Sequence, residues 1–173
     1  MNWDDYPYVD TAFGGPDKRN NVIRLTDIPH IMPDVPDCYY TWHRFAKDYQ
    51  AYATSTGGIK GYKGASYADF LPFDIDREGD LEGALSDTRA LVARLEVDYD
   101  IPTESMRLWF SGSKGFHLCV SAGVFGPQWT PGDTLPGHLK RLAARMAGDV
   151  GIDSSIYDQN RLWRIPNTVN SKT

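Results

Sequence analysis

The chain of 173 residues has little of the sulfur and imidazole that protein zinc sites use. It contains two cysteines, Cys38 and Cys119, which lie far apart and outside any CxxC pattern, and four histidines. Structural zinc sites need four such ligands, usually at short spacings. We therefore expect no zinc, and we expect both thiols to be buried as small apolar side chains.

Long apolar runs are also missing. No stretch approaches the ~20 apolar residues of a membrane-spanning helix, and the N-terminal residues MNWDDYPYVD are acidic and aromatic, unlike a signal peptide. These features predict a cytoplasmic protein without membrane partners. The hydrophobic fraction of 41% and the aromatic fraction of 13% are typical of a globular protein. We expect residues 1–173 to form a single domain, which could be the N-terminal part of a longer protein.

Positive charge is scarce overall, with a net charge of -5, which argues against a protein that coats duplex nucleic acid. The charge is unevenly distributed. Residues 1–105 hold 10 Lys/Arg and 19 Asp/Glu, net -9, whereas residues 106–173 hold 8 and 4, net +4. The basic C-terminal part is consistent with a local face for an anionic ligand, or with an ordinary solvated surface.

The pattern of apolar residues predicts alternating strands and helices. Residues 1–38 are rich in Pro, Gly and Asp and are expected to be an irregular, wrapping segment with at most short elements. Strands are predicted over 38–44, 67–75, 107–110, 116–121 and 161–165, and helices over 45–55, 81–95 and 135–150. The strands over 107–110 and 116–121 are expected to form a hairpin. The fold class is therefore α/β in the broad sense, of the α+β kind, with a mixed sheet.

Two acidic residues end the strand predicted over 67–75. Asp74 and Asp76 follow the apolar run 70–73 and flank Ile75. Residues i and i+2 of a strand point to the same face, with Cα atoms roughly 6.6 Å apart. Two carboxylates so placed suit one or two Mg²⁺ or Mn²⁺ ions, which prefer oxygen ligands. The alternative is a solvated strand end without a metal.

The predicted hairpin turn carries a group of residues suited to binding an anion. Ser111 and Ser113 offer hydroxyl groups, Lys114 offers a point charge, and His117 offers an imidazole donor, while the intervening glycines allow close backbone approach. The segment does not fit the GxxxxGK[ST] phosphate loop or the GxSxG nucleophile elbow. The alternative is a plain hairpin turn with a buried histidine.

The C-terminal part adds a third acid and two arginines. Asp153 follows a predicted helix and could complete a three-carboxylate cluster. A triphosphate is more negative than such a cluster can neutralise, so basic side chains are expected nearby. Arg161 and Arg164 are candidates, because guanidinium groups bind phosphate bidentately. On an ideal strand these two would face opposite sides. The alternative is that they are surface arginines paired with local acids such as Asp158.

Together the three motifs resemble those of the archaeo-eukaryotic primase superfamily, the primase-polymerases. The matching features are the strand-borne DxD of residues 73–76, the SxxxGxH of residues 111–117, and the hydrophobic-Asp of residues 152–153 followed by the basic stretch 157–164. They occur in the family order over about residues 39–173, and the resemblance implies that this range is the catalytic core. The SGSKG form is similar to that of end-joining polymerase domains, and the RLWRIPNT stretch is closer to primases of phages, plasmids and mobile elements.

The resemblance implies a fold, an activity and a set of site residues. The implied fold is a primase catalytic core with an RRM-like subdomain. Asp74, Asp76 and Asp153 would be metal ligands for two Mg²⁺ or Mn²⁺ ions, and the residues that would bind the nucleotide are Ser111, Ser113, Lys114, His117, Arg161 and Arg164.

The implied activity is that of a DNA primase/polymerase, which makes or extends primers on a single-stranded DNA template from NTPs or dNTPs, with a helicase or accessory domain C-terminal to this chain as a further partner. Two alternatives remain open. One is a gap-filling end-joining polymerase, and the other is a non-catalytic RRM-like nucleic-acid-binding module.

Overall fold

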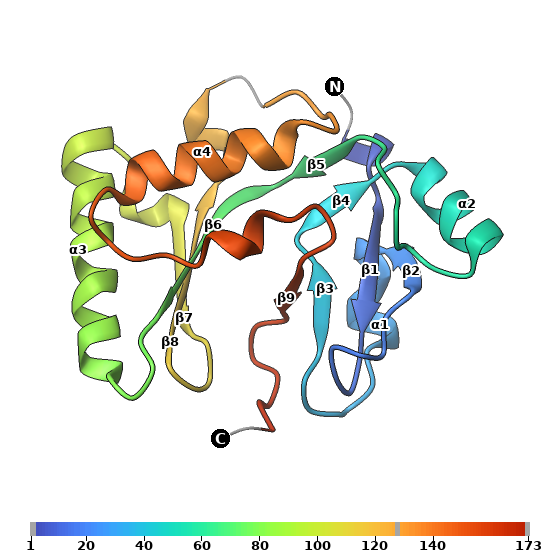
Figure 1. The fold of residues 1–173 in the computed structure, drawn as a ribbon, viewed down its shortest axis with the longest axis horizontal. Coiled ribbons are helices and arrows are strands. Elements are labelled where there is room, and N and C mark those ends of the chain that lie inside the picture. The colour runs from blue at the N-terminus through green and yellow to red at the C-terminus, as the bar shows by residue number, and fades with distance from the viewer. Residues whose placement is uncertain (1–2, 127–128, 172–173) are drawn as a thin grey trace. The chain divides into compact units, whose positions relative to one another are not determined.

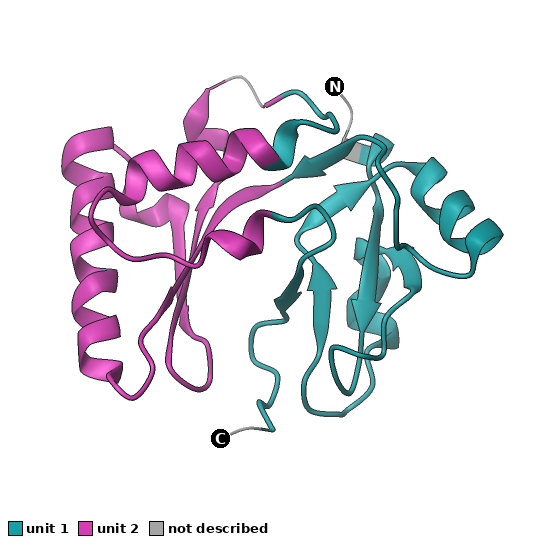
Figure 2. Cartoon of the chain, in the orientation of Figure 1, with its two compact units in different colours: residues 1–68, 130–136, 158–171 teal, residues 69–129, 137–157, 172–173 magenta. Residues whose placement is uncertain are grey.

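The computed structural model describes residues 3–126 and 129–171, and it divides the chain into two compact units (Figure 2). Unit 1 consists of residues up to 68 together with 130–136 and 158–171. Unit 2 consists of residues 69–129 and 137–157. Each unit is therefore assembled from segments that are distant in the sequence.

Unit 1 is built on a six-stranded sheet in which every pairing is antiparallel (Figure 1). Its strands follow the order β5-β4-β1-β3-β9, and β2 also pairs with β1. The strands are β1 (Tyr8–Ala12), β2 (Asn21–Arg24), β3 (Tyr39–Thr41), β4 (His43–Phe45), β5 (Ser66–Ala68) and β9 (Leu162–Arg164). The short elements η1 (Trp3–Asp5), η2 (Leu25–Asp27) and α1 (Ile28–Ile31) and the helix α2 (Lys47–Thr56) complete the unit.

Residues 3–38 contain only short elements, as expected, but two of them, β1 and β2, are paired strands of the unit 1 sheet and not irregular structure. Every residue of β1 is buried. The strand is hidden in the sequence because it includes two polar residues, Asp10 and Thr11. The buried Asp10 carboxylate accepts hydrogen bonds from Arg19 Nε at 2.9 Å and from the Asn20 backbone N–H at 2.8 Å. Because these partners satisfy the buried carboxylate, the strand tolerates an acid at a position where the apolar pattern of a buried strand would be interrupted.

The predicted helix over 45–55 is confirmed as α2. It ends at Gly57, whose φ of 77° lies in the left-handed region that glycine adopts without strain. The predicted strand over 38–44 is present as β3 and β4, and the last predicted strand is present as β9.

Unit 2 contains a three-stranded antiparallel sheet of order β6-β8-β7 (Figure 1). The strands are β6 (Phe70–Asp76), β7 (Met106–Phe110) and β8 (Gly115–Ser121). The helices of this unit are α3 (Leu81–Tyr99), most of α4 (Leu135–Ala147), and the short turns η3 (Thr103–Ser105), η4 (Ala122–Phe125) and η5 (Ser154–Tyr157). The hairpin formed by β7 and β8 is the one that the sequence predicts.

The single strand predicted over 67–75 is wrong, because it is divided between the two sheets. β5 ends at Ala68 and pairs with β4, and β6 begins at Phe70 and pairs with β8. Ala68 is fully buried in one sheet and Leu71 in the other, and the break between them falls at Asp69, a single polar residue in an otherwise apolar stretch. A lone polar residue in a strand pattern also fits an outward-facing position, so it does not by itself show where one sheet ends and the next begins.

Helix α3 covers one face of the unit 2 sheet, in contact with β6 and β8. Asp80 caps its N-terminus by accepting a hydrogen bond from the Gly83 N–H at 2.9 Å. Four residues of the helix are buried, namely Ala84, Thr88, Leu91 and Leu95, whereas Leu81 at its first position is 42% exposed. Leu71, Phe73 and Ile75 of β6 are fully buried. No helix within residues 3–126 and 129–171 combines the length and the apolar character needed to cross a membrane.

Candidate active site

Strand β6 places two acidic side chains on the face of the sheet opposite to that of Ile75. Asp74 and Asp76 alternate with the fully buried Ile75, and their side chains are 13% and 26% exposed. The alternation of a β-strand puts both carboxylates on one face. The predicted pair is therefore formed by the sequence Asp-Ile-Asp at the end of this strand.

The neighbouring strand β8 brings His117 to the same face. Asp74 lies opposite His117 in the register, and His117 Nε2 is 3.6 Å from Asp74 Oδ1. On the other side of β8, Trp109 of β7 lies opposite His117, and the two rings meet edge to face with centroids 6.1 Å apart. The imidazole is thus held between an acid and an indole and is 10% exposed.

Gly115 allows β8 to approach the end of β6 closely. It lies opposite Asp76, and a Cβ atom at this position would come within 3 Å of the Ile75 carbonyl oxygen and of Asp76 itself. These contacts are closer than real Cβ atoms make, so any side chain would push Asp76 away. The glycine of the SxxxGxH motif is therefore required here by packing against the acid.

The turn between β7 and β8 directs Lys114 back to the acids. The Ser111 N–H donates to the Gly115 carbonyl at 2.9 Å, and the Arg77 N–H donates to the Lys114 carbonyl at 3.0 Å. Lys114 Nζ lies 3.3 Å from Asp76 Oδ2 and 3.6 Å from Glu78 Oε2. The hydrogen bond and the charge of Asp76, followed by Glu78, raise the pKa of Lys114, so it remains cationic.

The two serines of the turn differ in exposure. Ser111, which closes the turn, is half-buried, whereas Ser113 is exposed. Both lie on the same short turn as Lys114. The structure therefore brings Ser111, Ser113 and Lys114 together at the end of the sheet where Asp76 lies.

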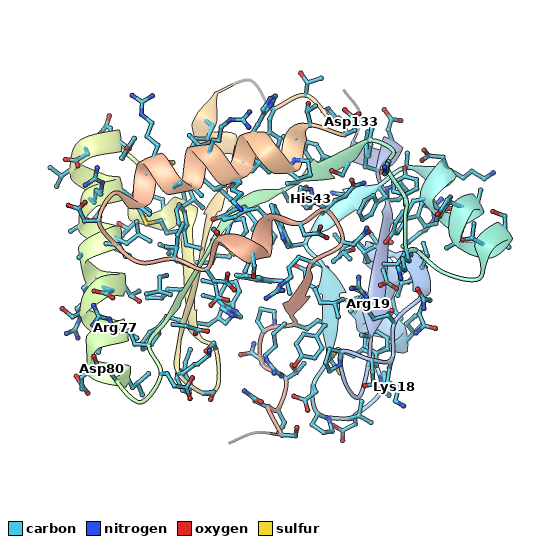
Figure 3. The ribbon with its side chains drawn as sticks, viewed as in Figure 1. Lys18, Arg19, His43, Arg77, Asp80 and Asp133 are labelled. Atoms are coloured by element: carbon cyan, nitrogen blue, oxygen red, sulfur yellow. The ribbon has the colours of Figure 1, made fainter. Side chains whose placement is uncertain are left out.

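An arginine after β6 fixes the start of the next helix. Arg77 donates to both carboxylate oxygens of Asp87, at 2.6 and 3.0 Å, and lies 3.5 Å from Asp80. Figure 3 shows Arg77 and Asp80 side by side at the beginning of α3. The bidentate pair joins the segment after the acids to the helix that packs behind the sheet.

Asp153 is placed beside Asp74 through the backbone. Its N–H donates to the Asp74 carbonyl at 2.9 Å. Its carboxylate accepts hydrogen bonds from the Ser155 N–H at 2.8 Å and the Ser155 hydroxyl at 2.9 Å, at the start of η5. The predicted third acid is thus adjacent to the pair, but its side chain caps the η5 turn.

The η5 segment also makes a buried contact with β6. The Tyr157 hydroxyl donates to the Pro72 carbonyl at 2.6 Å. Burial raises the pKa of Tyr157, and the nearby ionisable groups of Cys119, Asp74 and Asp153 add to this effect. Pro72 has no N–H to donate, which a strand tolerates only where that position faces away from its ladder partner. Asp153 and Tyr157 therefore cover the outer edge of β6.

The candidate metal ligands at this site are the two carboxylates of β6. Within residues 3–126 and 129–171, no group of three or more His, Cys, Asp or Glu side chains is arranged to hold a metal ion. The two aspartates nevertheless provide the oxygen donors that Mg²⁺ and Mn²⁺ prefer. Asp76 Oδ1 is also buried and has no hydrogen-bond partner in the part of the chain that the structure describes, and a buried carboxylate oxygen of this kind fits a cation ligand. The pair therefore suits a divalent ion, and the role of Asp153 as a third ligand stays a prediction.

The two predicted arginines belong to unit 1, not unit 2. Arg164 lies on β9, where it donates to Asp37 at 3.0 Å and to the Tyr39 hydroxyl at 2.6 Å, with its guanidinium 4.7 Å from the Tyr39 ring centroid. Arg161 is exposed, and its N–H donates to the Asp158 carbonyl at 2.9 Å. Arg164 is thus engaged within its own unit, and nucleotide binding by both arginines stays a prediction.

Two contributions to the site are absent from the sequence prediction. The sequence indicates Tyr157 only as part of the basic C-terminal stretch, and Trp109 only as an aromatic residue that packs in the core or stacks on a base. The available signal for Tyr157 is its position four residues after the third acid, which is one turn of a short helix. Trp109 could be found by extending the hairpin register from Ser111 and Gly115.

A scan against known protein families finds no family that matches this chain, and a search of curated proteins finds no match either.

Proposed function

We propose that this protein is a metal-dependent nucleotidyltransferase of the primase-polymerase type, which makes or extends primers on single-stranded DNA from NTPs or dNTPs. The observation that carries the proposal is the arrangement at the end of the unit 2 sheet. Asp74 and Asp76 share one face, His117 lies 3.6 Å from the first acid, and Lys114 lies 3.3 Å from the second. Motifs about 40 residues apart in the sequence thereby form one polar site.

The acidic pair supplies the ligands for divalent ions. Asp74 and Asp76 would hold Mg²⁺ or Mn²⁺ with their facing carboxylates, and Asp153 would join them by turning its side chain away from Ser155. When bound, such ions stabilise charge on an attacking 3′-hydroxyl and on departing pyrophosphate. Gly115 keeps the second acid in place because it leaves no side chain between β8 and β6.

The turn residues would hold the triphosphate. Lys114 provides a cation whose raised pKa keeps it charged at neutral and alkaline pH. The Ser111 and Ser113 hydroxyls and His117 would donate hydrogen bonds to phosphate oxygens. Trp109 and Asp74 limit the movement of the imidazole. Arg161 and Arg164 are proposed as further phosphate ligands on the strength of the sequence motif, and Arg164 would have to give up its contact with Asp37 to take that role.

The proposed fold assignment is a primase catalytic core with an RRM-like subdomain. Two features support it: the mixture of antiparallel sheets and helices, and the position of the acids on a sheet strand that is covered on its other face by α3. A helicase or accessory domain is a proposed further partner for primer initiation.

Metal-dependent nucleotide binding tests this proposal without relying on turnover. Isothermal titration of the protein with dATP or ATP in the presence of Mn²⁺ should show binding that is absent without the metal. The double variant Asp74→Asn/Asp76→Asn should lose this binding, and Asp98→Asn on the exposed side of α3 should keep it. Metal-independent binding, or equal binding by the double variant, would argue for a nucleic-acid-binding module instead. Preferential binding to a gap with a 5′-phosphate would favour the end-joining alternative.

A further inference from the structure

The two outer edges of the unit 2 sheet differ in whether other segments of the chain contact them. At the β6 edge, the carbonyls of Pro72 and Asp74 accept hydrogen bonds from Tyr157 and from the Asp153 backbone. At the opposite edge, β7 pairs with β8, and no further strand lies beside β7 among residues 3–126 and 129–171. One edge of the sheet is therefore covered and the other is open.

The register of the hairpin shows which backbone groups point out from the open edge. The Ser111 N–H bonds to the Gly115 carbonyl, and bonded pairs alternate along an antiparallel ladder. Trp109 therefore exchanges its hydrogen bonds with β8. Leu108 and Phe110 direct their N–H and C=O groups away from β8, toward the open side.

The side chains of β7 make this edge favourable for pairing. Leu108 and Phe110 are 48% and 47% exposed. Natural edge strands usually carry lysines, prolines, bulges or inward-pointing charges, and these features discourage pairing with another strand. The sequence of β7, Met-Arg-Leu-Trp-Phe, contains none of these apart from the single charge of Arg107.

We propose that β7 pairs antiparallel with β7 of a second copy of this chain, about a two-fold axis that passes through the Leu108 pair. In this register Leu108 faces its own copy, Met106 faces the partner's Phe110, and Arg107 faces the partner's Trp109. Leu108 and Phe110 use the outward backbone groups described above. The two three-stranded sheets then form one continuous six-stranded sheet.

Electrostatic complementarity favours a second copy as the occupant of this edge. Arg107 is the only charged residue of β7, and the register places it against the partner's indole ring and not against the partner's guanidinium. A guanidinium over an indole face is attractive, and so is a thioether beside an aromatic ring, as for Met106 and Phe110. No like charges lie opposite one another in this strand pair.

The same axis gathers the exposed apolar residues. A two-fold axis perpendicular to the sheet keeps corresponding faces on the same side. Leu108 and Phe110 of both copies therefore come together, each Phe110 next to its own Phe116 at a ring distance of 5.7 Å. Strands of five residues bury less than a standard interface of about 1,600 Å². We therefore expect a dimer that dissociates on dilution.

Sedimentation velocity across a range of concentrations tests the proposal on the whole chain. The wild type should shift from monomer to dimer as the concentration rises. Leu108→Lys should remain monomeric because it places two ammonium groups opposite each other. Val97→Lys, at an 82% exposed position on α3, is the matched control and should dimerise like the wild type. An equimolar mixture of Leu108→Lys and Leu108→Glu should recover the dimer, which specifically reports a position facing its own copy.

Cross-linking gives a second readout of the register. Directly opposed residues of a hydrogen-bonded antiparallel pair have Cα atoms about 5.5 Å apart, which a disulfide can span. Leu108→Cys should therefore form a covalent dimer on mild oxidation. Arg107→Cys, whose copies lie diagonally at about 7–8 Å, should not. A wild type that stays monomeric at all concentrations, or a dimer that Leu108→Lys leaves intact, would overturn the proposal.

Discussion

Lys114 lies between two carboxylates at the end of β6, and this position gives it a defined charge state. Its ammonium is 3.3 Å from Asp76 and 3.6 Å from Glu78, and these acids raise its pKa. A lysine with a raised pKa keeps its charge until the pH exceeds its ordinary value of 10.5. Binding that depends on this charge should therefore not decline across neutral and mildly alkaline pH.

Replacing Lys114 tests whether this charge contributes to nucleotide binding. Lys114→Ala should weaken nucleotide binding roughly 10–100-fold, the range for losing one hydrogen bond to a charged group. Lys140→Ala, at an exposed position on α4, should bind like the wild type. Dissociation constants measured by titration decide the matter. An unchanged constant for Lys114→Ala would assign the lysine to pairing with Asp76 alone.

His43 gives a pH prediction for stability that is independent of the active site. The residue is fully buried on β4 of unit 1 (Figure 3). Burial lowers its pKa from 6.5 to about 3, and an interaction with the Tyr67 backbone opposes this shift in part. The folded protein therefore keeps His43 neutral, whereas the unfolded chain protonates it below pH 6.5. The resulting stability is present above that pH and is lost as the pH falls toward 3.

Denaturant unfolding at several pH values measures this effect. Between pH 6 and 4, His43 should lower the free energy of unfolding by up to about 1.4 kcal/mol for each unit of decreasing pH. His43→Gln should show a shallower decline, because the other titrating groups are unchanged. Parallel declines in the two proteins would show that His43 does not contribute to acid sensitivity.

At the scale of the elements, the close approach of β8 to β6 depends on one glycine. Gly115→Ala should force the strands apart at Asp76, because the added Cβ meets the Ile75 carbonyl. Overpacking of this kind costs about 1–3 kcal/mol, and nucleotide transfer should fall along with stability. Gly123→Ala on η4, whose nearest contact is ordinary at 3.7 Å, should change neither. Thermal unfolding and activity assays on both variants test the difference. A Gly115→Ala protein with normal stability and activity would contradict the packing described here.

The edge of β6 depends similarly on the hydroxyl of Tyr157. Tyr157→Phe removes the donor to the buried Pro72 carbonyl and leaves that carbonyl without its partner. The expected loss in the free energy of unfolding is about 1–3 kcal/mol. Tyr99→Phe, which removes an exposed hydroxyl bonded to the Arg145 carbonyl, is the matched control and should lose less. Equal losses in the two variants would mean that the β6 contact is not specifically stabilising.

The sequence predicts elements well where a regular pattern or a turn signal is present. The Asp80 cap defines the start of α3, Gly57 ends α2, and the Gly-Ser-Lys-Gly turn predicts the hairpin that contains His117. Strand β1 escapes prediction because its buried Asp10 is compensated by Arg19, a partner supplied by a different segment. The sequence also does not reveal that the Asp153 carboxylate accepts hydrogen bonds from Ser155, two residues later.

At the scale of the whole molecule, the described part of the chain passes between the two units after residues 68, 129, 136 and 157. A sequence expectation of one domain cannot reveal such an arrangement, because the composition does not change at these points. The acids, the turn residues and His117 all fall within unit 2. The strands that carry Asp74, Asp76 and His117 are paired neighbours, so these motifs lie close together in the structure. The arginines at 161 and 164 fall within unit 1, and local sequence gives no indication of that division.

Primer synthesis on single-stranded DNA is the most direct test of the central claim. The assay uses labelled NTPs and dNTPs with Mn²⁺ or Mg²⁺, with and without an annealed primer. We expect metal-dependent products from the wild type and from Asp98→Asn, and we expect Asp74→Asn and Asp76→Asn to remain folded but lose activity by about a hundredfold or more, as removal of charge stabilisation at a reacting group does. Full activity in the Asp74→Asn protein, or no product from the wild type under any of these conditions, would contradict the account.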